Sequence, residues 1–224
     1  MFSRTELLIG DSINKLHNSK VIVFGVGGVG GYAVEMLARA GVGNFTLVDY
    51  DKVDISNKNR QIIALDSTIG KNKVDVMKER ILSYYPDCNV NVILSKLSPD
   101  NIESFNLENY DYIVDAIDMV TSKVALITYA KENNIPIISA MGAGNRIGVP
   151  KVQVCDIYKT YNDGLSKVMR KLLRERNIKS HKVVFCENNS INVSSNTIGS
   201  ISYFPAICGC MLSASVIEDI IKGE

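Results

Sequence analysis

The stretch KVIVFGVGGVGGYAVEMLARA (20–40) decides the fold. It opens with a β-branched and aromatic run, KVIVFG (20–25), and closes with an apolar-periodic segment, GGYAVEMLARA (30–40), so it predicts a strand followed by a helix. Glycines in G-x-G-x-x-G spacing permit a tight turn, let backbone N–H groups approach phosphate oxygens, and point the helix N-terminus at negative charge. The turn contains four such glycines: Gly25, Gly27, Gly28 and Gly30. We therefore predict a nucleotide-binding turn between the strand and the helix.

The same alternation of β-branched runs and helical segments continues to the end of the chain, which is typical of parallel βαβ units. We expect further strands at 44–49, 89–94, 110–118, 135–141, 152–158 and 182–186. We expect further helices at 72–85, 121–133, 164–177 and 203–221. The pattern predicts an α/β fold with a doubly wound, mostly parallel Rossmann-like sheet. Residues 1–224 are expected to form a single domain, in which 149–224 is a C-terminal extension with a basic helix and a final packed helix.

Composition narrows the class of protein. The 224 residues are 46% apolar and 22% charged, which is ordinary for a globular chain. The net charge of +1 means that any nucleic-acid partner must be bound by a local patch. Five cysteines without a Cys-x-x-Cys pair argue against a structural zinc site and for a reducing, cytoplasmic location. The apolar segment 204–221 contains small and polar residues and ends in acids, so we expect a packed helix, with Cys208 and Cys210 in the core, and no membrane insertion.

Residues after the second strand decide which nucleotide is bound. Asp49 ends that strand, where a carboxylate can accept hydrogen bonds from ribose hydroxyls, and on this motif alone a nicotinamide dehydrogenase is the default. The runs DYDKVDISNKNRQ (49–61) and GKNK (70–73) instead concentrate Asn, Arg and Lys. These residue types neutralise charge on phosphoryl oxygens and on a leaving pyrophosphate. The pattern favours an enzyme that transfers a carboxylate oxygen onto the α-phosphorus of ATP.

The succession of G-x-G-G-x-G, D-x-D, S-N-x-x-R-Q, G-x-x-K and D-A-I-D resembles the ubiquitin-activating-enzyme-like adenylyltransferases of the ThiF, HesA and MoeB type. The resemblance implies ATP and magnesium, with the ribose held by Asp49 and the metal and phosphates organised by Asp118. It implies phosphate contacts or adjacent positions for Asn57, Arg60, Gln61 and Lys73, with Asp51 as the second aspartate of D-x-D.

Ordinary alternatives exist for these charged residues. Most single Arg and Lys side chains are simply exposed to solvent, which could hold for Arg60 and Lys73. Asp51 could be only a turn residue, and Asp118 could cap the helix that follows it.

The same family supplies an arginine from the opposite subunit of a dimer, within an R-x-x-x-x-x-G segment near the N-terminus. The matching segment here is RTELLIG (4–10), which places that arginine at Arg4. The resemblance therefore implies a homodimer with a shared active site. The alternative is that Arg4, close to a chain terminus, is disordered.

Within this family the chain is most similar to the tRNA threonylcarbamoyladenosine dehydratases. The similarity covers essentially the whole chain and is carried by RTELLIG (4–10), DAID (115–118), IPIISAMGAGN (135–145), VCDIYKT (154–160) and GSISYFPAICG (199–209). It implies that ATP activates the threonine carboxylate on adenosine 37 of tRNA, after which an intramolecular nucleophile closes a ring and AMP leaves.

Two alternatives remain open at this point. One is an activator of a ubiquitin-like sulfur-carrier protein, although such enzymes commonly carry two Cys-x-x-Cys pairs that this chain lacks. The other is an NAD-dependent redox enzyme or a redox-sensing binding module.

A basic segment supports a nucleic-acid partner. Between Tyr161 and Lys182 seven cations face two acids, a local charge of +5. Clustered cations of this kind neutralise backbone phosphates and release counterions. The alternative is a solvated helix face, and both can hold for one helix. The residues expected to contact tRNA are Lys167, Arg170, Lys171 and Arg174. The residues expected on the core side of the helix are Leu165, Val168, Leu172 and Leu173.

Overall fold

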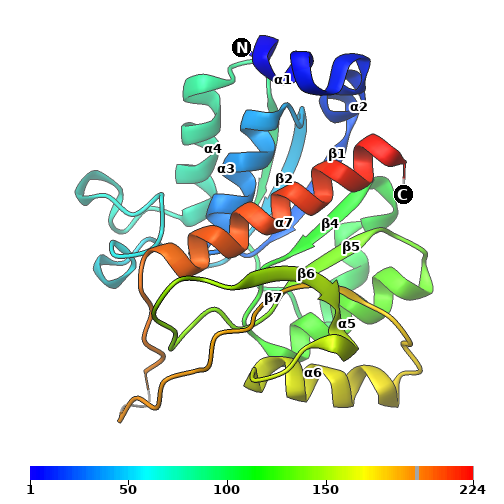
Figure 1. The fold of residues 1–224 in the computed structure, drawn as a ribbon. Helices are drawn as coiled ribbons and strands as arrows, with labels where there is room; N and C mark the ends of the chain where they lie inside the picture. The colour runs from blue at the N-terminus through cyan, green and yellow to red at the C-terminus, as the bar shows by residue number, and fades with distance from the viewer. Residues whose placement is uncertain (195–196, 224) are drawn as a thin grey trace.

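A seven-stranded sheet in the order β3-β2-β1-β4-β5-β7-β6 forms the centre of the computed structural model, which describes residues 1–194 and 197–223 (Figure 1). Its strands are β1 Lys20–Phe24, β2 Asn44–Val48, β3 Asn89–Ile93, β4 Tyr112–Asp115, β5 Ile137–Ala140, β6 Val152–Asp156 and β7 Lys182–Cys186. All neighbouring pairs are parallel except β6 with β7. The predicted doubly wound, mostly parallel fold is therefore confirmed.

The order in which successive strands are added to the sheet reverses between β1 and β4. From β1 it proceeds to β2 and β3 on one side, and from β4 it proceeds to β5 and β7 on the other. In open parallel sheets of this kind the loops after the two central strands diverge, and a crevice opens between them at the carboxyl ends of the strands. This topology places the predicted glycine turn, which follows β1, beside the loop that follows β4.

Helices cover both faces of the sheet. They are α1 Ser3–Ile9, α2 Ile13–Asn18, α3 Gly30–Ala40, α4 Lys73–Tyr84, α5 Val120–Glu132, α6 Gly164–Glu175 and α7 Tyr203–Lys222. Side chains alternate between the faces of a strand, so Val21 and Val23 of β1 pack with α3, α4 and α7, whereas Ile22 and Phe24 pack with α5 and α6. The short helices α1 and α2, which were not predicted from the sequence, lie at the end of the sheet where β1 begins (Figure 1).

Helix α7 is long and apolar enough, by length and composition, to cross a membrane. Here it packs along α3, and Gly209 lies so close to that helix that a Cβ on it would be 2.4 Å from the carbonyl oxygen of Val29. Near its C-terminal end, Asp219 accepts hydrogen bonds from Tyr112 and Lys182 beside the sheet. Helix α7 is therefore packed against the rest of the fold, as the sequence predicted.

Two expectations for individual side chains on the helices were wrong. Cys208 is buried as expected, but Cys210 is exposed, because residues two apart on an α-helix point about 200° apart. On α6, Val168 is 44% exposed and Met169 takes the core position instead. In both cases the sequence correctly indicated an apolar helix, but the wrong residue was assigned to its buried face.

A buried carboxylate joins α3 to α4. The side chain of Glu35 is 2% exposed and accepts hydrogen bonds from Arg39 at 2.7 Å, from Arg80 at 2.9 and 3.2 Å, and from Tyr84 at 3.2 Å. Burial acts to raise the pKa of Glu35, but the hydrogen bonds and positive charges of Arg80 and Arg39 outweigh it and hold that pKa below its ordinary value. Because α3 begins at the glycine turn and α4 begins at Lys73, this network fixes the relative position of two predicted phosphate-binding segments.

We expect Glu35→Gln to lower the free energy of unfolding by about 1–3 kcal/mol near neutral pH, since the change leaves two guanidinium groups without their counter-charge. A carboxyl whose folded pKa is depressed stabilises the fold above its unfolded pKa and loses that effect as the pH falls through the folded value. Urea denaturation at about pH 7 and about pH 3.5 should therefore show the difference between variant and parent shrinking in acid. An equal difference at both pH values would contradict this account, and Glu79→Gln on the exposed face of α4 is the matched control.

Candidate active site

A pocket of about 740 Å³ lies at the carboxyl ends of the central strands. Every residue predicted to bind the cofactor lines it, except Gly30, which packs against the carbonyl group of Gly25. The predicted residues at the pocket are Gly25, Gly27, Gly28, Asp49, Asp51, Asn57, Arg60, Gln61, Lys73 and Asp118. Four segments that are far apart in the sequence thus meet at one cavity, and their role in binding remains a prediction.

The glycine turn is too tight for any other residue at two of its positions. A Cβ on Gly30 would lie 1.8 Å from the carbonyl oxygen of Gly25, and one on Gly25 would lie 2.7 Å from the carbonyl oxygen of Ala116. Gly25 also has a φ of 86°, in the region that side chains disfavour. The absence of side chains leaves the backbone of the turn and the first residues of α3 open to the pocket, where N–H groups can face a phosphate.

Asp49 holds the turn from the side of β2. One carboxylate oxygen accepts the N–H of Val26 at 2.7 Å, and the other accepts the N–H of Asp51 at 2.9 Å. Each carboxylate oxygen has a further lone pair, so the group can also accept hydrogen bonds from a ligand in the pocket. The residue predicted to hold the ribose therefore also organises the glycine turn.

Lys73 is not a surface cation. It is the first residue of α4, it is 6% exposed, and its Nζ lies 2.8 Å from an oxygen of Asp51. The backbone oxygen of Asp51 also accepts the N–H of Lys73 at 3.0 Å, so a side-chain and a main-chain contact join this residue to the start of α4. A buried ammonium held at the mouth of a pocket by one carboxylate can exchange part of that contact for a phosphate oxygen.

Arg60 follows a short 3₁₀ helix, Ile55–Asn57, at the edge of the pocket. Its Nη1 donates to the backbone oxygen of Ser56 at 2.8 Å and to Oδ1 of Asn59 at 2.9 Å. Its Nε and Nη2 make no hydrogen bond to any residue in the described part of the chain. The guanidinium is thus held by one nitrogen and has free N–H groups for an anion.

Two buried amides complete this side of the pocket. Asn57 is buried, and its Oδ1 accepts the N–H of Asp54 at 3.1 Å, which stabilises the 3₁₀ helix. Gln61 is also buried, and its Oε1 has no hydrogen-bond partner among the described residues. A buried polar atom without a partner is costly in a folded protein, so it marks a place where a ligand or a water completes the hydrogen bonding.

Asp118 is exposed at the pocket after β4. The alternative role as a helix cap is wrong, because the N-cap of α5 is Met119 and no side chain caps that helix. The negative charges of Asp51, Asp118 and Asp49, together with burial, raise the pKa of the Tyr50 hydroxyl. All three carboxylates line the pocket, so this side of it is negatively charged. No group of three or more metal-ligating side chains occurs within residues 1–194 and 197–223.

Two buried ion pairs at the pocket were not predicted. Lys123 of α5 donates to Asp115 at 2.7 Å and to the backbone oxygen of Ala140 at 3.0 Å, with both side chains fully buried. Directly after the wall formed by residues 141–145, Nη2 of Arg146 lies 3.4 Å from Oδ1 of Asp163, which also caps α6 through the N–H of Ser166. Asp115 belongs to the D-A-I-D motif, but nothing in the local sequence links Asp115 to α5 or Asp163 to the wall.

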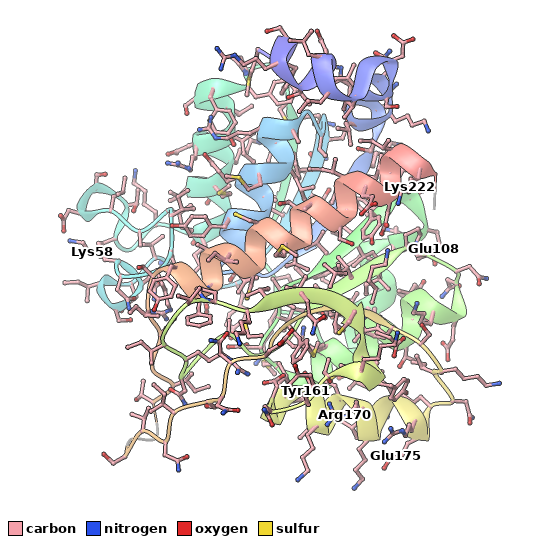
Figure 2. All side chains as sticks on the ribbon, viewed as in Figure 1. Lys58, Glu108, Tyr161, Arg170, Glu175 and Lys222 are labelled. Carbon is pink, nitrogen blue, oxygen red and sulfur yellow. The ribbon has the colours of Figure 1, made fainter. Side chains whose placement is uncertain are left out.

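The predicted nucleic-acid residues lie on α6, and they are not equivalent (Figure 2). Lys167, Lys171 and Arg174 are exposed, although Arg174 stacks on Tyr158 at 4.9 Å. Arg170 is partly buried, and its Nη1 donates to the backbone oxygen of Thr160 at 2.8 Å. Arg170 therefore fixes the segment before the helix, and the exposed basic surface consists of the other three side chains.

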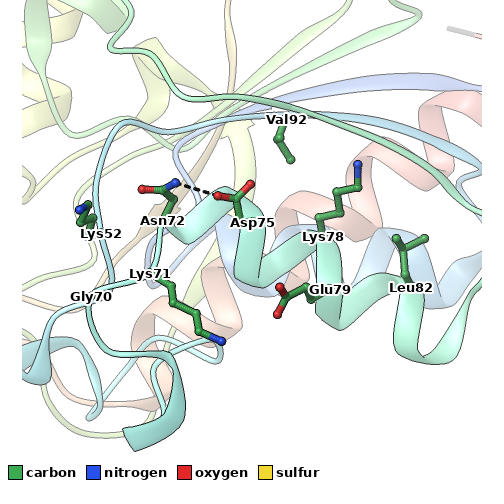
Figure 3. Close-up of a pocket in the computed structure, with 9 residues that line it drawn as sticks. All are labelled: Lys52, Gly70, Lys71, Asn72, Asp75, Lys78, Glu79, Leu82 and Val92. Carbon is green, nitrogen blue, oxygen red and sulfur yellow. Dashed lines mark hydrogen bonds between the residues drawn. The ribbon is translucent and has the colours of Figure 1, made fainter.

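Two further features lie outside the pocket. Arg4 is exposed on α1, is ordered in a helix, and does not line the pocket of its own chain. A second pocket of about 600 Å³ lies on the outer side of α4, where acids alternate with lysines and Asn72 bonds Asp75 at 2.7 Å (Figure 3).

Comparison with known proteins agrees with this geometry. The model of the ThiF family matches residues 3–223. The tRNA threonylcarbamoyladenosine dehydratase of Bacillus subtilis is 38% identical over 240 residues, covering 99% of this chain and 94% of the relative. The Escherichia coli enzyme of the same name is 41% identical over 174 residues, covering 77% of this chain and 65% of the relative.

Solved structures show the same fold. The Escherichia coli tRNA N6-threonylcarbamoyladenosine dehydratase in complex with AMP superimposes with a TM-score of 0.94 at 33% identity, covering 99% of this chain and 94% of that one. The same enzyme in complex with ATP gives a TM-score of 0.93. With a family model that spans nearly every residue and relatives that match along the full length, the chain belongs to the ThiF family.

Proposed function

We propose that this chain is an ATP-dependent tRNA threonylcarbamoyladenosine dehydratase. It adenylates the threonine carboxylate of the modified adenosine at position 37 of tRNA and promotes its cyclisation. The observation that carries the proposal is the meeting of the glycine turn, Asp49, Arg60 and Lys73 at one pocket. Relatives of that name, which match this chain at up to 99% coverage, support the choice of substrate.

The pocket residues suit the first step. The turn and the N-terminus of α3 hold phosphate oxygens, and Asp49 accepts hydrogen bonds from the ribose. A carboxylate oxygen of the substrate then forms a bond to the α-phosphorus as the bond to the β-phosphate oxygen breaks, so an acyl adenylate and pyrophosphate result. Arg60 and Lys73 stabilise the negative charge that gathers on the phosphoryl oxygens and on the leaving group.

The second step closes the ring. An intramolecular nucleophile of the modified base attacks the activated carbonyl carbon, loses its proton, and expels AMP. AMP departs with one of the two former carboxylate oxygens, so the net change in the base is the loss of water. Residues 141–145 and the N-terminus of α6 line the pocket and would exclude bulk water from the acyl adenylate.

Magnesium fits the side chains on this face of the pocket. The ion is usually held by one or two carboxylates together with substrate phosphates and waters, so a three-residue protein cage is not required. Asp118 is exposed at the pocket beside Asp51 and Asp49, and we assign it the metal. When bound, magnesium would neutralise negative charge on the leaving pyrophosphate.

The basic surface of α6 is the proposed contact for tRNA. Lys167, Lys171 and Arg174 are exposed there, and Gly164 and Leu165 at the N-terminus of the same helix line the pocket. One helix therefore carries both the exposed cations and a wall of the active site, so phosphates of a bound anticodon loop would lie beside the adenylation site. We place the enzyme in the cytoplasm, where its tRNA substrate and free thiols are expected.

Pyrophosphate release from ATP tests the function. We expect release that depends on tRNA carrying the linear modification, with little release for unmodified tRNA or for a sulfur-carrier protein with a Gly-Gly tail. Lys73→Ala and Arg60→Ala should each lower kcat/KM at least about 100-fold, since each removes charge stabilisation of the transition state. Release that requires the carrier protein would favour the alternative activity, and near-normal rates in both variants would contradict the proposed site.

We also propose that Arg4 acts in the pocket of a partner subunit, because it is exposed on α1 and is not part of the pocket of its own chain. Arg4→Ala and Lys73→Ala should each be inactive alone. A mixture of the two should regain up to about a quarter of the parent rate through hybrid dimers that contain one unaltered site. Analytical ultracentrifugation should show a dimer, and the absence of recovery in a mixture shown to exchange subunits would exclude the shared site.

A further inference from the structure

Residues 198–200, which we call the strap, lie between the two walls of the pocket. Ile198 and Ser200 both line the cavity, and hydrogen bonds join Gly199 to one side of the pocket and Ser200 to the other. On one side is the wall of residues 141–145, and on the other is the segment that carries Asn57 and Arg60. The strap is therefore the part of the C-terminal segment that joins the phosphate side of the pocket to its opposite side.

Asn145 attaches the strap to the first wall. Its backbone N–H donates to the oxygen of Gly199 at 2.7 Å, and its side-chain Oδ1 accepts the N–H of Gly199 at 2.6 Å. Its backbone oxygen accepts the N–H of Ile191 at 2.7 Å, which holds the segment that leads to the strap. Asn145 has a φ of 53°, a left-handed conformation that asparagine, aspartate and glycine tolerate best.

Asn59 attaches the strap to the phosphate side. Its Nδ2 donates to the backbone oxygen of Ser200 at 2.9 Å, and its Oδ1 accepts Nη1 of Arg60 at 2.9 Å. The two contacts use opposite ends of one planar amide, so Asn59 links the strap to the guanidinium, which the backbone oxygen of Ser56 also holds. Asn59 itself is exposed and does not line the pocket, so it cannot act by touching the ligand.

We propose that Asn59 is a positioning residue that couples the strap to Arg60, so that the guanidinium is held ready for phosphate only while the strap joins both walls. The inference rests on the proposed function for the use of Arg60 on the phosphates of ATP. A modified tRNA whose carboxylate enters beside residues 141–145 would contact the strap, which is linked to Arg60 through Asn59. Binding of the tRNA would thereby be linked to stabilisation of the leaving pyrophosphate.

A double-mutant cycle on ATP binding tests the coupling. Asn145→Gly keeps the left-handed backbone but removes the side-chain bond to the strap, and we expect it to weaken ATP binding about 10-fold, as for loss of a hydrogen bond to a charged group. Asn59→Ala should weaken binding by a similar factor. When Arg60→Ala or Asn59→Ala is already present, Asn145→Gly should cause no further loss, because its effect passes through those residues. Isothermal calorimetry with ATP and magnesium, without tRNA, measures all of these.

Two controls separate coupling from general damage. Asn145→Asp retains the acceptor oxygen for the N–H of Gly199 but adds a negative charge to the pocket, so it should recover part of the affinity that Asn145→Gly loses, and the recovery should be larger at high salt. Lys58→Ala alters the residue next to Asn59, whose Nζ pairs with Asp66 at 2.7 Å on the outside of the loop (Figure 2), and it should leave ATP affinity unchanged. Thermal denaturation checks that each variant is folded.

The outcomes are distinct. Losses from Asn145→Gly and Arg60→Ala that multiply in the double variant would overturn the coupling, since a strap that acts independently of Arg60 gives independent effects. No effect of Asn59→Ala on ATP affinity would also overturn it. Because the cycle is read on ATP alone, a protein that shows the coupling but releases no pyrophosphate with modified tRNA would contradict the proposed substrate and leave the coupling supported.

Discussion

The close approach of Gly30 to Gly25 determines how β1 joins α3. A single added carbon at Gly30 would lie 1.8 Å from the carbonyl oxygen of Gly25, so the end of β1 and the start of α3 can meet only without side chains. Asp49 then fixes the turn to β2 through the N–H of Val26. This junction sets where the backbone N–H groups point, and every other pocket residue is arranged around it.

Each side of the pocket is held by a buried or half-buried ion pair and not by the loops alone. Lys73 with Asp51 holds the start of α4, Lys123 with Asp115 holds the loop after β4, and Arg146 with Asp163 holds the wall opposite the turn. Such pairs contribute little net stability because of the cost of burying charge, but breaking one leaves an uncompensated charge. Their placement at the pocket keeps loops that carry function in one arrangement while leaving the Arg60 guanidinium partly free.

The sequence was most informative where local chemistry determines structure. The strand–turn–helix, the alternation of strands and helices, and the residues from Asp49 to Lys73 could all be placed because each depends on spacing within a short segment. The partners Lys123, Arg146 and Asp163 could not, because their contacts join segments that only the folded sheet brings together. Val168 was assigned to the core in place of Met169 because helical periodicity locates an apolar stripe less precisely than it locates a helix. The antiparallel direction of β6 likewise depends on tertiary pairing with β7.

The central claim is that the pocket joins a carboxylate of modified tRNA to the α-phosphorus of ATP. It is tested most directly by labelling the carboxylate oxygens of the threonine group with the heavy isotope of oxygen, allowing a single turnover, and measuring the mass of the AMP released. The released AMP should carry one labelled oxygen, because the former carboxylate oxygen leaves with the phosphate. Unlabelled AMP, or label found in inorganic phosphate with ADP as the co-product, would contradict it.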